Sequence, residues 1–156
     1  MMKEVTWNEI DNHCRELADK IVSSGKKYDV SVGVGRGGLI PAVILSHQLG
    51  VPLIPINWQL RDSDTADYHM DNYALLKKVV GNSKNLLLVD DINDTGKTMN
   101  DIKYQINLKM LEDGNRRGFN MDTATLYQKT KTSHGPNSFC ELVDDSVWVV
   151  FPWEQE

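Results

Sequence analysis

The residues with the clearest chemical potential lie together in the stretch 86–99, LLLVDDINDTGKTM. Four apolar residues predict a buried parallel strand, and three carboxylates follow it at Asp90, Asp91 and Asp94. Carboxylates at a strand end can hold ribose hydroxyls or a hydrated Mg²⁺ ion. The Thr-Gly-Lys-Thr turn at 95–98 opens a helix, and its hydroxyls and N–H groups can hold a phosphate. The stretch therefore predicts a site for a phosphorylated ligand.

Two other interpretations of this stretch stay open at the level of sequence. Residues 96–98, GKT, match the end of the nucleotide-binding pattern G-x-x-x-x-G-K-[ST], but that pattern needs a glycine where this chain has Asp91. A carboxylate at that position would repel phosphate, which argues against a P-loop. The second interpretation is an acidic turn that only caps a helix.

Composition limits the classes of protein to consider. The chain has 156 residues, 40% of them hydrophobic, which is enough for one domain spanning residues 1–156. A net charge of −5 without a long basic run argues against nucleic acid as the main partner. Cys14 and Cys140 are far apart in sequence and near no histidine cluster, so we interpret them as buried free thiols. Without an apolar signal region or a run of about 18 apolar residues, a cytoplasmic protein with no membrane partner is expected.

Hydrophobic periodicity predicts alternating strands and helices. Strands are expected at 28–34, 51–56, 86–89, 121–127, 138–143 and 147–151, and helices from the Thr6 capping box to Ser24 and at 39–49, 74–80 and 99–111. This order predicts an α/β fold, with an open and mainly parallel sheet flanked by helices. In such sheets ligands bind beyond the carboxyl ends of the strands. Residues 58–73 are polar and aperiodic, which is typical of a functional loop or lid.

A glycine-rich loop follows the first strand of the expected sheet. Residues 33–38, GVGRGG, satisfy the dinucleotide fingerprint G-x-G-x-x-G, but the next strand ends at Ile56 and Asn57 without the acid that binds ribose in such sites. The glycines instead allow a small anion-binding turn, in which Arg36 adds charge. A plain glycine turn is the remaining alternative. Because this loop and the stretch 86–99 both follow strands, we expect them to open onto the same edge of the sheet.

The stretch 86–99 resembles the phosphoribosyl-pyrophosphate (PRPP) loop of the type I phosphoribosyltransferases, and its DTGKTM part resembles their purine branch. Residues 35–38 resemble the pyrophosphate loop of the same family, in which the peptide before the arginine is often cis. The resemblance implies that both loops hold PRPP. The contacts it implies are Arg36, Gly37, Gly38, Asp90, Asp91, Asp94, Thr95, Gly96, Lys97 and Thr98.

The C-terminal part of the chain adds to the resemblance. Lys129, Trp148 and Val149 match residues that, in purine phosphoribosyltransferases, contact the oxygen at C6, stack on the ring and read its edge. A flat apolar face with one cation suits a purine, although each residue taken singly reads more plainly as a surface lysine or a core tryptophan. The ending at 152–154, PWE, resembles the xanthine-guanine group, whereas KTM at 97–99 resembles the hypoxanthine-guanine group. The preferred base therefore stays open.

The resemblance implies transfer of the phosphoribosyl group of PRPP to N9 of a 6-oxopurine, with release of pyrophosphate. Asp94 is then the general base that takes the proton at N7. Mg²⁺ is the implied cofactor, with Asp90, Asp91 and Glu154 as its ligands. The lid at 58–73 and the C-terminal segment would form a small hood. Relatives are dimers or tetramers, so a homo-oligomer is expected.

Two functional alternatives remain. A protein of the same fold can sense PRPP or a nucleotide without turnover, but such regulators usually carry a DNA-binding module or a basic face, and neither is evident in this sequence. A pyrimidine or orotate phosphoribosyltransferase is the nearest alternative enzyme. Lys129 and Trp148 argue against it, because a pyrimidine gives no reason for a purine-type C-terminus.

Overall fold

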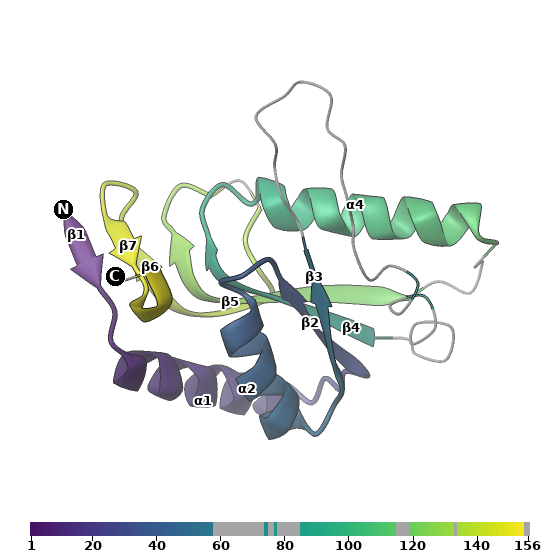
Figure 1. The fold of residues 1–156 in the computed structure, drawn as a ribbon, viewed down its shortest axis with the longest axis horizontal. Helices are drawn as coiled ribbons and strands as arrows, with labels where there is room; N and C mark the ends of the chain where they lie inside the picture. The colour runs from purple at the N-terminus through teal and green to yellow at the C-terminus, as the bar shows by residue number, and fades with distance from the viewer. Residues whose placement is uncertain (58–73, 75–76, 78–84, 115–118, 133, 155–156) are drawn as a thin grey trace.

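The computed structural model describes residues 1–57, 74, 77, 85–114, 119–132 and 134–154. In chain order the described elements are β1 (Met2–Glu4), α1 (Trp7–Ser23), β2 (Val30–Val34), α2 (Leu39–Leu49), β3 (Leu53–Ile56), β4 (Asn85–Asn93), α4 (Lys97–Glu112), β5 (Asn120–Lys129), β6 (Ser138–Val143), β7 (Trp148–Val150) and the 3-10 turn η1 (Pro152–Glu154). The strands form a five-stranded sheet in the order β3-β2-β4-β5-β6 and a two-stranded sheet of β1 and β7. Every pairing between described strands is parallel, which confirms the expected architecture (Figure 1).

The central strand β4 shows why its sequence is continuously apolar. Leu86 and Leu88 belong to a hydrophobic core that they share with α4, while Leu87 and Val89 belong to a second core shared with α1 and α2. Figure 1 shows α4 above the sheet and α1 and α2 below it. Because alternate side chains of a strand point to opposite faces, a strand covered on both faces must be apolar throughout.

Two glycines allow α2 to lie close to the sheet. A Cβ on Gly33, in β2, would lie 3.0 Å from the Cβ of Ala42. Gly38, at the N-cap of α2, is held more tightly, since a Cβ there would lie 2.5 Å from the carbonyl oxygens of both Val34 and Val89. The helix that follows the glycine-rich loop is therefore fixed against both central strands, and the loop is fixed with it.

Most of the expected elements are confirmed, with shifted ends. The Thr6 capping box forms in full, and α1 and α2 have the expected extents. β4 is longer than expected: it continues to Asn93 and so includes Asp90 and Asp91, because β5 runs alongside and pairs with it to that point. α4 also begins earlier than expected, at Lys97. The expected lid at 58–73 lies outside the described residues. So does the expected helix at 74–80, except for residues 74 and 77.

The glycine-rich loop differs in one backbone feature from many of the loops that it resembles. No peptide bond among the described residues is cis, so the peptide before Arg36 is trans, unlike the often cis peptide of the pyrophosphate loops that it resembles. Gly35 turns the chain instead, with a φ of 58° that a residue with a side chain rarely adopts. The left-handed glycine reverses the backbone between β2 and α2 without an isomerised bond.

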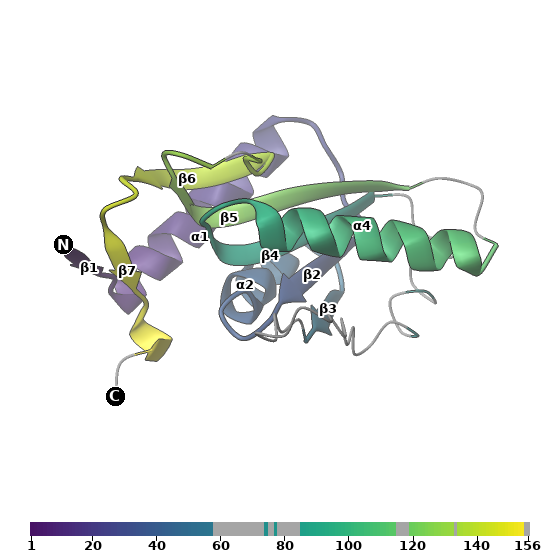
Figure 2. The ribbon, with the colours of Figure 1, turned by 90° about the horizontal axis from the view of Figure 1, so that it is seen from above.

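The two ends of the described chain meet in the small sheet. β1 pairs with β7, and the Trp148 N–H donates to the Met1 carbonyl oxygen at 2.8 Å. The sequence predicted β7 but not β1, because a strand of three residues has no periodicity of its own. Figure 2 shows this small sheet beside the end of the main sheet, with η1 following β7. No helix within the described part of the chain is long and apolar enough to cross a membrane.

Gly38→Ala is expected to destabilise the protein, because its Cβ would overlap two backbone carbonyls that cannot move without disturbing β2 and β4. Overpacking of this kind costs about 1–3 kcal/mol of unfolding free energy, which urea denaturation measures. Gly135→Ala is the matched control, because a Cβ there would meet its nearest neighbour, on Gln128, at an ordinary 3.4 Å. Equal denaturation midpoints for the two variants would contradict this account of how α2 docks.

Candidate functional site

The glycine-rich and acid-rich loops meet at the carboxyl edge of the sheet, as their positions after strands predicted. β2 and β4 are neighbours, and a Cβ on Gly37 would overlap the carboxylate of Asp91. The glycine therefore permits an approach that any side chain would block. Arg36, the preceding residue, is exposed. The two motifs recognised separately in the sequence thus form one continuous surface.

A cavity of about 820 Å³ opens between these loops. Five of the expected PRPP contacts line it, together with Trp153 and Glu154 of the C-terminal turn; the five are Arg36, Gly37, Asp90, Asp91 and Thr98. Gly38 does not line this cavity, because it packs beneath it as the N-cap of α2. Its expected contact with PRPP stays a prediction, as do those of Thr95, Gly96 and Lys97, which also lie outside the lining of this cavity.

A second cavity, of about 380 Å³, adjoins the first. Asp94 lines it together with all three expected purine contacts, Lys129, Trp148 and Val149. Asp91 and Glu154 line both cavities, so the two share a wall. The structure therefore brings the expected base site directly beside the expected PRPP site.

The burial of Lys129 and of Trp148 is the opposite of what each residue type, taken singly, suggests. Lys129 is buried, with 7% of its surface exposed, and its ammonium donates to the carbonyl oxygens of Val147 and, at 3.4 Å, of Asp144. Trp148 is 70% exposed at the rim of the smaller cavity. The interpretation of Lys129 as a surface lysine and that of Trp148 as a core residue are therefore both wrong. The buried cation and the open indole face are arranged around one cavity.

The turn after Asp94 is held from behind by a neighbouring loop. Gly96 has a φ of 88°, and a Cβ on it would lie 2.5 Å from the carbonyl oxygen of His134. Within the turn, the Lys97 N–H donates to the Thr95 hydroxyl at 3.2 Å. Asp94, Thr95 and Lys97 are exposed. The backbone of this turn is therefore fixed, while its polar side chains face outward at the start of α4.

Asn93 and His134 line neither cavity, but they support the acid-rich loop, and the sequence analysis did not single them out. Asn93 is only 3% exposed, and its amide donates to the Thr132 hydroxyl and the His134 carbonyl oxygen, each at 3.0 Å. These two bonds tie the connection between β5 and β6 to the acid-rich loop. One feature of the sequence could have pointed to Asn93. It is a polar residue between Asp91 and Asp94, at a position where the alternation of side chains along a strand predicts a buried side chain.

The two adjacent aspartates are costly to ionise. Burial raises the pKa of Asp90 well above its usual value, and the charge of Asp91 raises it further. Burial also raises the pKa of Asp91, with the Glu154 carboxylate adding to the effect. The Asp91 N–H donates to Asp90 at 2.9 Å and the Ile92 N–H to Asp91 at 2.7 Å, which offsets only part of this rise. A bound cation would relieve the repulsion.

The expected magnesium ligands do not gather into a cluster of three carboxylates. Among the described residues, no three carboxylates have oxygens within 4.8 Å of one another. Glu154 accepts a hydrogen bond from the Phe151 N–H at 3.0 Å, and so closes its own turn. Mg²⁺ usually keeps several waters and takes one or two protein carboxylates plus substrate phosphates. Asp90 and Asp91, adjacent and lining the larger cavity, fit that requirement.

Asp91→Asn is expected to raise the melting temperature of the protein at neutral pH without Mg²⁺. Since the pKa of this carboxyl group is raised by folding, the folded state binds its proton more tightly than the unfolded state does. That stabilisation is present below about pH 4 and is lost as the pH rises, whereas an amide never ionises. The gain should therefore shrink as the pH falls towards 4.

Asp19→Asn is the control for this experiment, because Asp19 is exposed on α1 and lines neither cavity. It should leave the melting temperature unchanged across the same pH range. A lower melting temperature for Asp91→Asn at neutral pH would show that the ionised carboxylate stabilises the fold, contrary to the burial argument.

Comparison with known proteins agrees with this geometry. The family model described as phosphoribosyl transferase domain matches residues 6–153. Over 158 aligned residues, the chain is 26% identical to the xanthine-guanine phosphoribosyltransferase of Nitratidesulfovibrio vulgaris (strain Hildenborough), covering 97% of this chain and 84% of that protein. The purine phosphoribosyltransferase from Pyrococcus horikoshii Ot3 superposes with a TM-score of 0.74 at 31% identity, over 99% of this chain and 95% of that one.

The Helicobacter pylori xanthine-guanine-hypoxanthine phosphoribosyltransferase shares the fold, with a TM-score of 0.73 at 22% identity over 99% of this chain and 94% of that one. These matches confirm the resemblance drawn from the two loops and the C-terminal residues. The family model alone covers almost the whole chain. The chain therefore belongs to the phosphoribosyl transferase domain family.

Proposed function

We propose that this chain is a purine phosphoribosyltransferase, which transfers the phosphoribosyl group of PRPP to N9 of a 6-oxopurine. The observation that carries the proposal is the shared wall of the two cavities, formed by Asp91 and Glu154. One cavity is lined by both phosphate-type loops and the other by Lys129 and Trp148. A sugar phosphate in the first would present its anomeric carbon to a base in the second. The purine specificity named for the matched relatives supports the same choice.

PRPP would occupy the larger cavity. Asp90 and Asp91 would accept hydrogen bonds from the ribose hydroxyls, and Arg36 with the backbone beside Gly37 would bind the pyrophosphate. The turn at 95–98, at the N-terminus of α4, would bind the 5-phosphate. Mg²⁺ held by the two aspartates would supply positive charge at the departing pyrophosphate.

The transfer would exchange one bond at C1 of the ribose for another. The bond from C1 to the pyrophosphate oxygen breaks, and its electron pair leaves with pyrophosphate. The bond from C1 to N9 of the base forms, and the proton at N7 passes to Asp94, which lines the base cavity. Positive charge builds on the ribose during this exchange, and the nearby carboxylates Asp90 and Asp91 would stabilise it.

A 6-oxopurine suits the smaller cavity. Trp148 offers an exposed flat face for stacking. An ammonium group has three N–H donors, and the backbone carbonyls of Asp144 and Val147 engage two of those of Lys129. The third would donate to O6 of the base. A buried cation already oriented by the backbone loses little freedom on binding, which favours a 6-oxo over a 6-amino purine.

Turnover with PRPP and Mg²⁺ is the direct test. Guanine, hypoxanthine or xanthine, offered singly, should yield the nucleoside monophosphate, whereas adenine, uracil and orotate should react poorly. Asp94→Asn should lower kcat by about 10²–10⁴-fold, the range for a general base, while Asp19→Asn should leave it unchanged. If no base gives product while calorimetry still shows PRPP binding, the proposal that the chain is an enzyme would be overturned. A PRPP sensor would then be favoured. Product from orotate or uracil would favour the pyrimidine alternative.

Trp148→Leu should weaken base binding without weakening PRPP binding. Stacking on an aromatic side chain contributes about 1–3 kcal/mol per base, so KM for the purine should rise by roughly 5–150-fold while KM for PRPP stays constant. Tyr104→Leu is the matched control, because it removes an aromatic side chain that is 63% exposed on α4. If both KM values rise together, the role of Trp148 is to stabilise the small sheet and not to stack on the base.

A further inference from the structure

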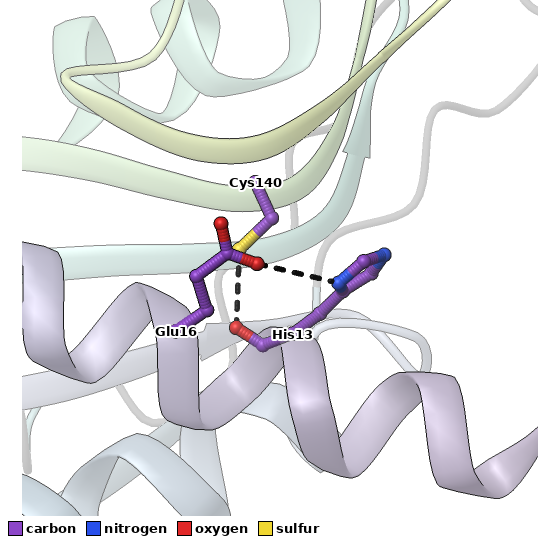
Figure 3. Close-up of side chains that lie close together, drawn as sticks. All are labelled: His13, Glu16 and Cys140. Atoms are coloured by element: carbon purple, nitrogen blue, oxygen red, sulfur yellow. Dashed lines mark hydrogen bonds and ion pairs between the residues drawn. The ribbon is translucent and has the colours of Figure 1, made fainter.

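A second group of chemically active side chains lies where α1 packs against β6. His13 and Glu16, on α1, and Cys140, on β6, place a ring nitrogen, a carboxylate oxygen and a sulfur within 4.8 Å of one another (Figure 3). Within the described part of the chain, no other three His, Cys, Asp or Glu side chains are so arranged. None of the three lines either cavity of the candidate site. The phosphoribosyl transfer chemistry therefore leaves this group unexplained.

The histidine ring is already oriented as a metal ligand would be. Nε2 lies 3.0 Å from the Glu141 carboxylate, while Nδ1 lies 3.8 Å from that of Glu16. Donation of Nε2–H to Glu141 leaves the lone pair of Nδ1 facing Glu16. A carboxylate on the remote nitrogen of a histidine is the usual outer support of a metal-binding imidazole. Tyr127 also packs edge-on against this ring, with the ring centroids 5.2 Å apart.

Cys140 completes the group with a sulfur held close to the histidine. Its thiol donates to the His13 carbonyl oxygen at 3.0 Å. Burial, and then the nearby Glu16 carboxylate, raise the pKa of Cys140 to about 12, so the thiol keeps its proton at neutral pH. In the sequence Cys140 lies near no histidine cluster, and 127 positions separate it from His13.

The charges around the group favour a divalent cation. Three carboxylates surround the group and the residues that support it, those of Glu9, Glu16 and Glu141. Two ammonium groups partly balance their charge. Lys3 forms ion pairs with Glu9 and Glu141, and Lys20 forms one with Glu16. With the thiol ionised, the group would carry two net negative charges. One dication would neutralise them.

We propose that His13, Glu16 and Cys140 bind one Zn²⁺ ion, with water in the fourth position. Zinc takes mixed nitrogen, oxygen and sulfur ligands in tetrahedral geometry, with bonds of about 2.0–2.3 Å and so neighbouring ligand atoms roughly 3.3–3.6 Å apart. The separation of 3.8 Å between Nδ1 and the Glu16 oxygen is close to this range. The ion would join α1 to β6 and have a structural role.

Binding would exchange a proton for the metal. The S–H bond of Cys140 breaks, its proton passes to solvent, and the sulfur electron pair forms the Zn–S bond. The imidazole and the carboxylate each contribute a lone pair, and no oxidation or reduction takes place. Because a cysteine thiol is ordinarily protonated at neutral pH, about one proton should be released for each zinc ion bound.

The test is a zinc titration of untagged, reduced, chelator-stripped protein in competition with a chromogenic chelator. Excess Mg²⁺ is present throughout, so that the acid-rich loop does not take up zinc. One Zn²⁺ per chain should bind, with release of about one proton and a melting temperature that rises with zinc concentration. Glu141→Gln should weaken binding by about 10–100-fold, the usual effect of losing the outer support of a ligand.

Matched variants separate this site from adventitious binding. His13→Gln and Cys140→Ser should abolish stoichiometric zinc binding, whereas His47→Gln, exposed on α2, and Cys14→Ala should retain it. Co²⁺ provides a readout on the folded wild-type chain: a sulfur-to-cobalt charge-transfer band should appear in the wild type and in Cys14→Ala.

Three results would overturn the proposal: no zinc bound below millimolar concentration, equal binding by His13→Gln and His47→Gln, or a cobalt spectrum without the charge-transfer band. The group would then be an ion-pair network that joins α1 to β6. None of these readouts is catalytic activity. The outcome is therefore independent of whether the chain transfers a phosphoribosyl group.

Discussion

Two neighbouring carboxylates at the end of a buried strand are the constraint on which the rest of the structure depends. Asp90 and Asp91 lose hydration and repel each other, so they require a proton or a cation. Parallel pairing fixes their strand between β2 and β5, and Gly37 brings the neighbouring loop onto the Asp91 carboxylate. The folded chain thus presents a concentrated negative charge that a proton or a bound cation would relieve.

The two sides of the proposed site, one for phosphate and one for the base, differ in how they are supported. The phosphate side rests on the central sheet, with Gly38 locking α2 to two strands and Asn93 locking the acid-rich loop to the next connection. The base side rests on the end of β5 and on the small sheet, where backbone carbonyls hold Lys129 and the indole of Trp148 stays open. The cavity proposed for the sugar phosphate is thus supported by the central sheet, and the cavity proposed for the base is supported largely by the small sheet.

The phosphate side could be predicted from the sequence because it depends on local patterns. A buried apolar run, acids at its end and a glycine-rich turn are all neighbours in the chain, and parallel topology alone brings them together. The base side could be predicted only by resemblance, because the partners of Lys129 lie in a distant loop. The strand β1, the Asn93–His134 bond and the pairing of His13 with Cys140 depend on contacts between remote segments, for which the sequence has no period.

The pairing of β1 with β7 has a consequence for the order of folding. It joins the two ends of the described chain, so that forming it closes nearly the whole chain into one loop. Contacts between residues so far apart in sequence cost more chain entropy to form than local contacts do. We therefore expect them to form after the local strand–helix units. Trp148 takes its backbone partner from this pairing. The backbone around Trp148 would therefore take its final place after the strand–helix units that carry the glycine-rich and acid-rich loops.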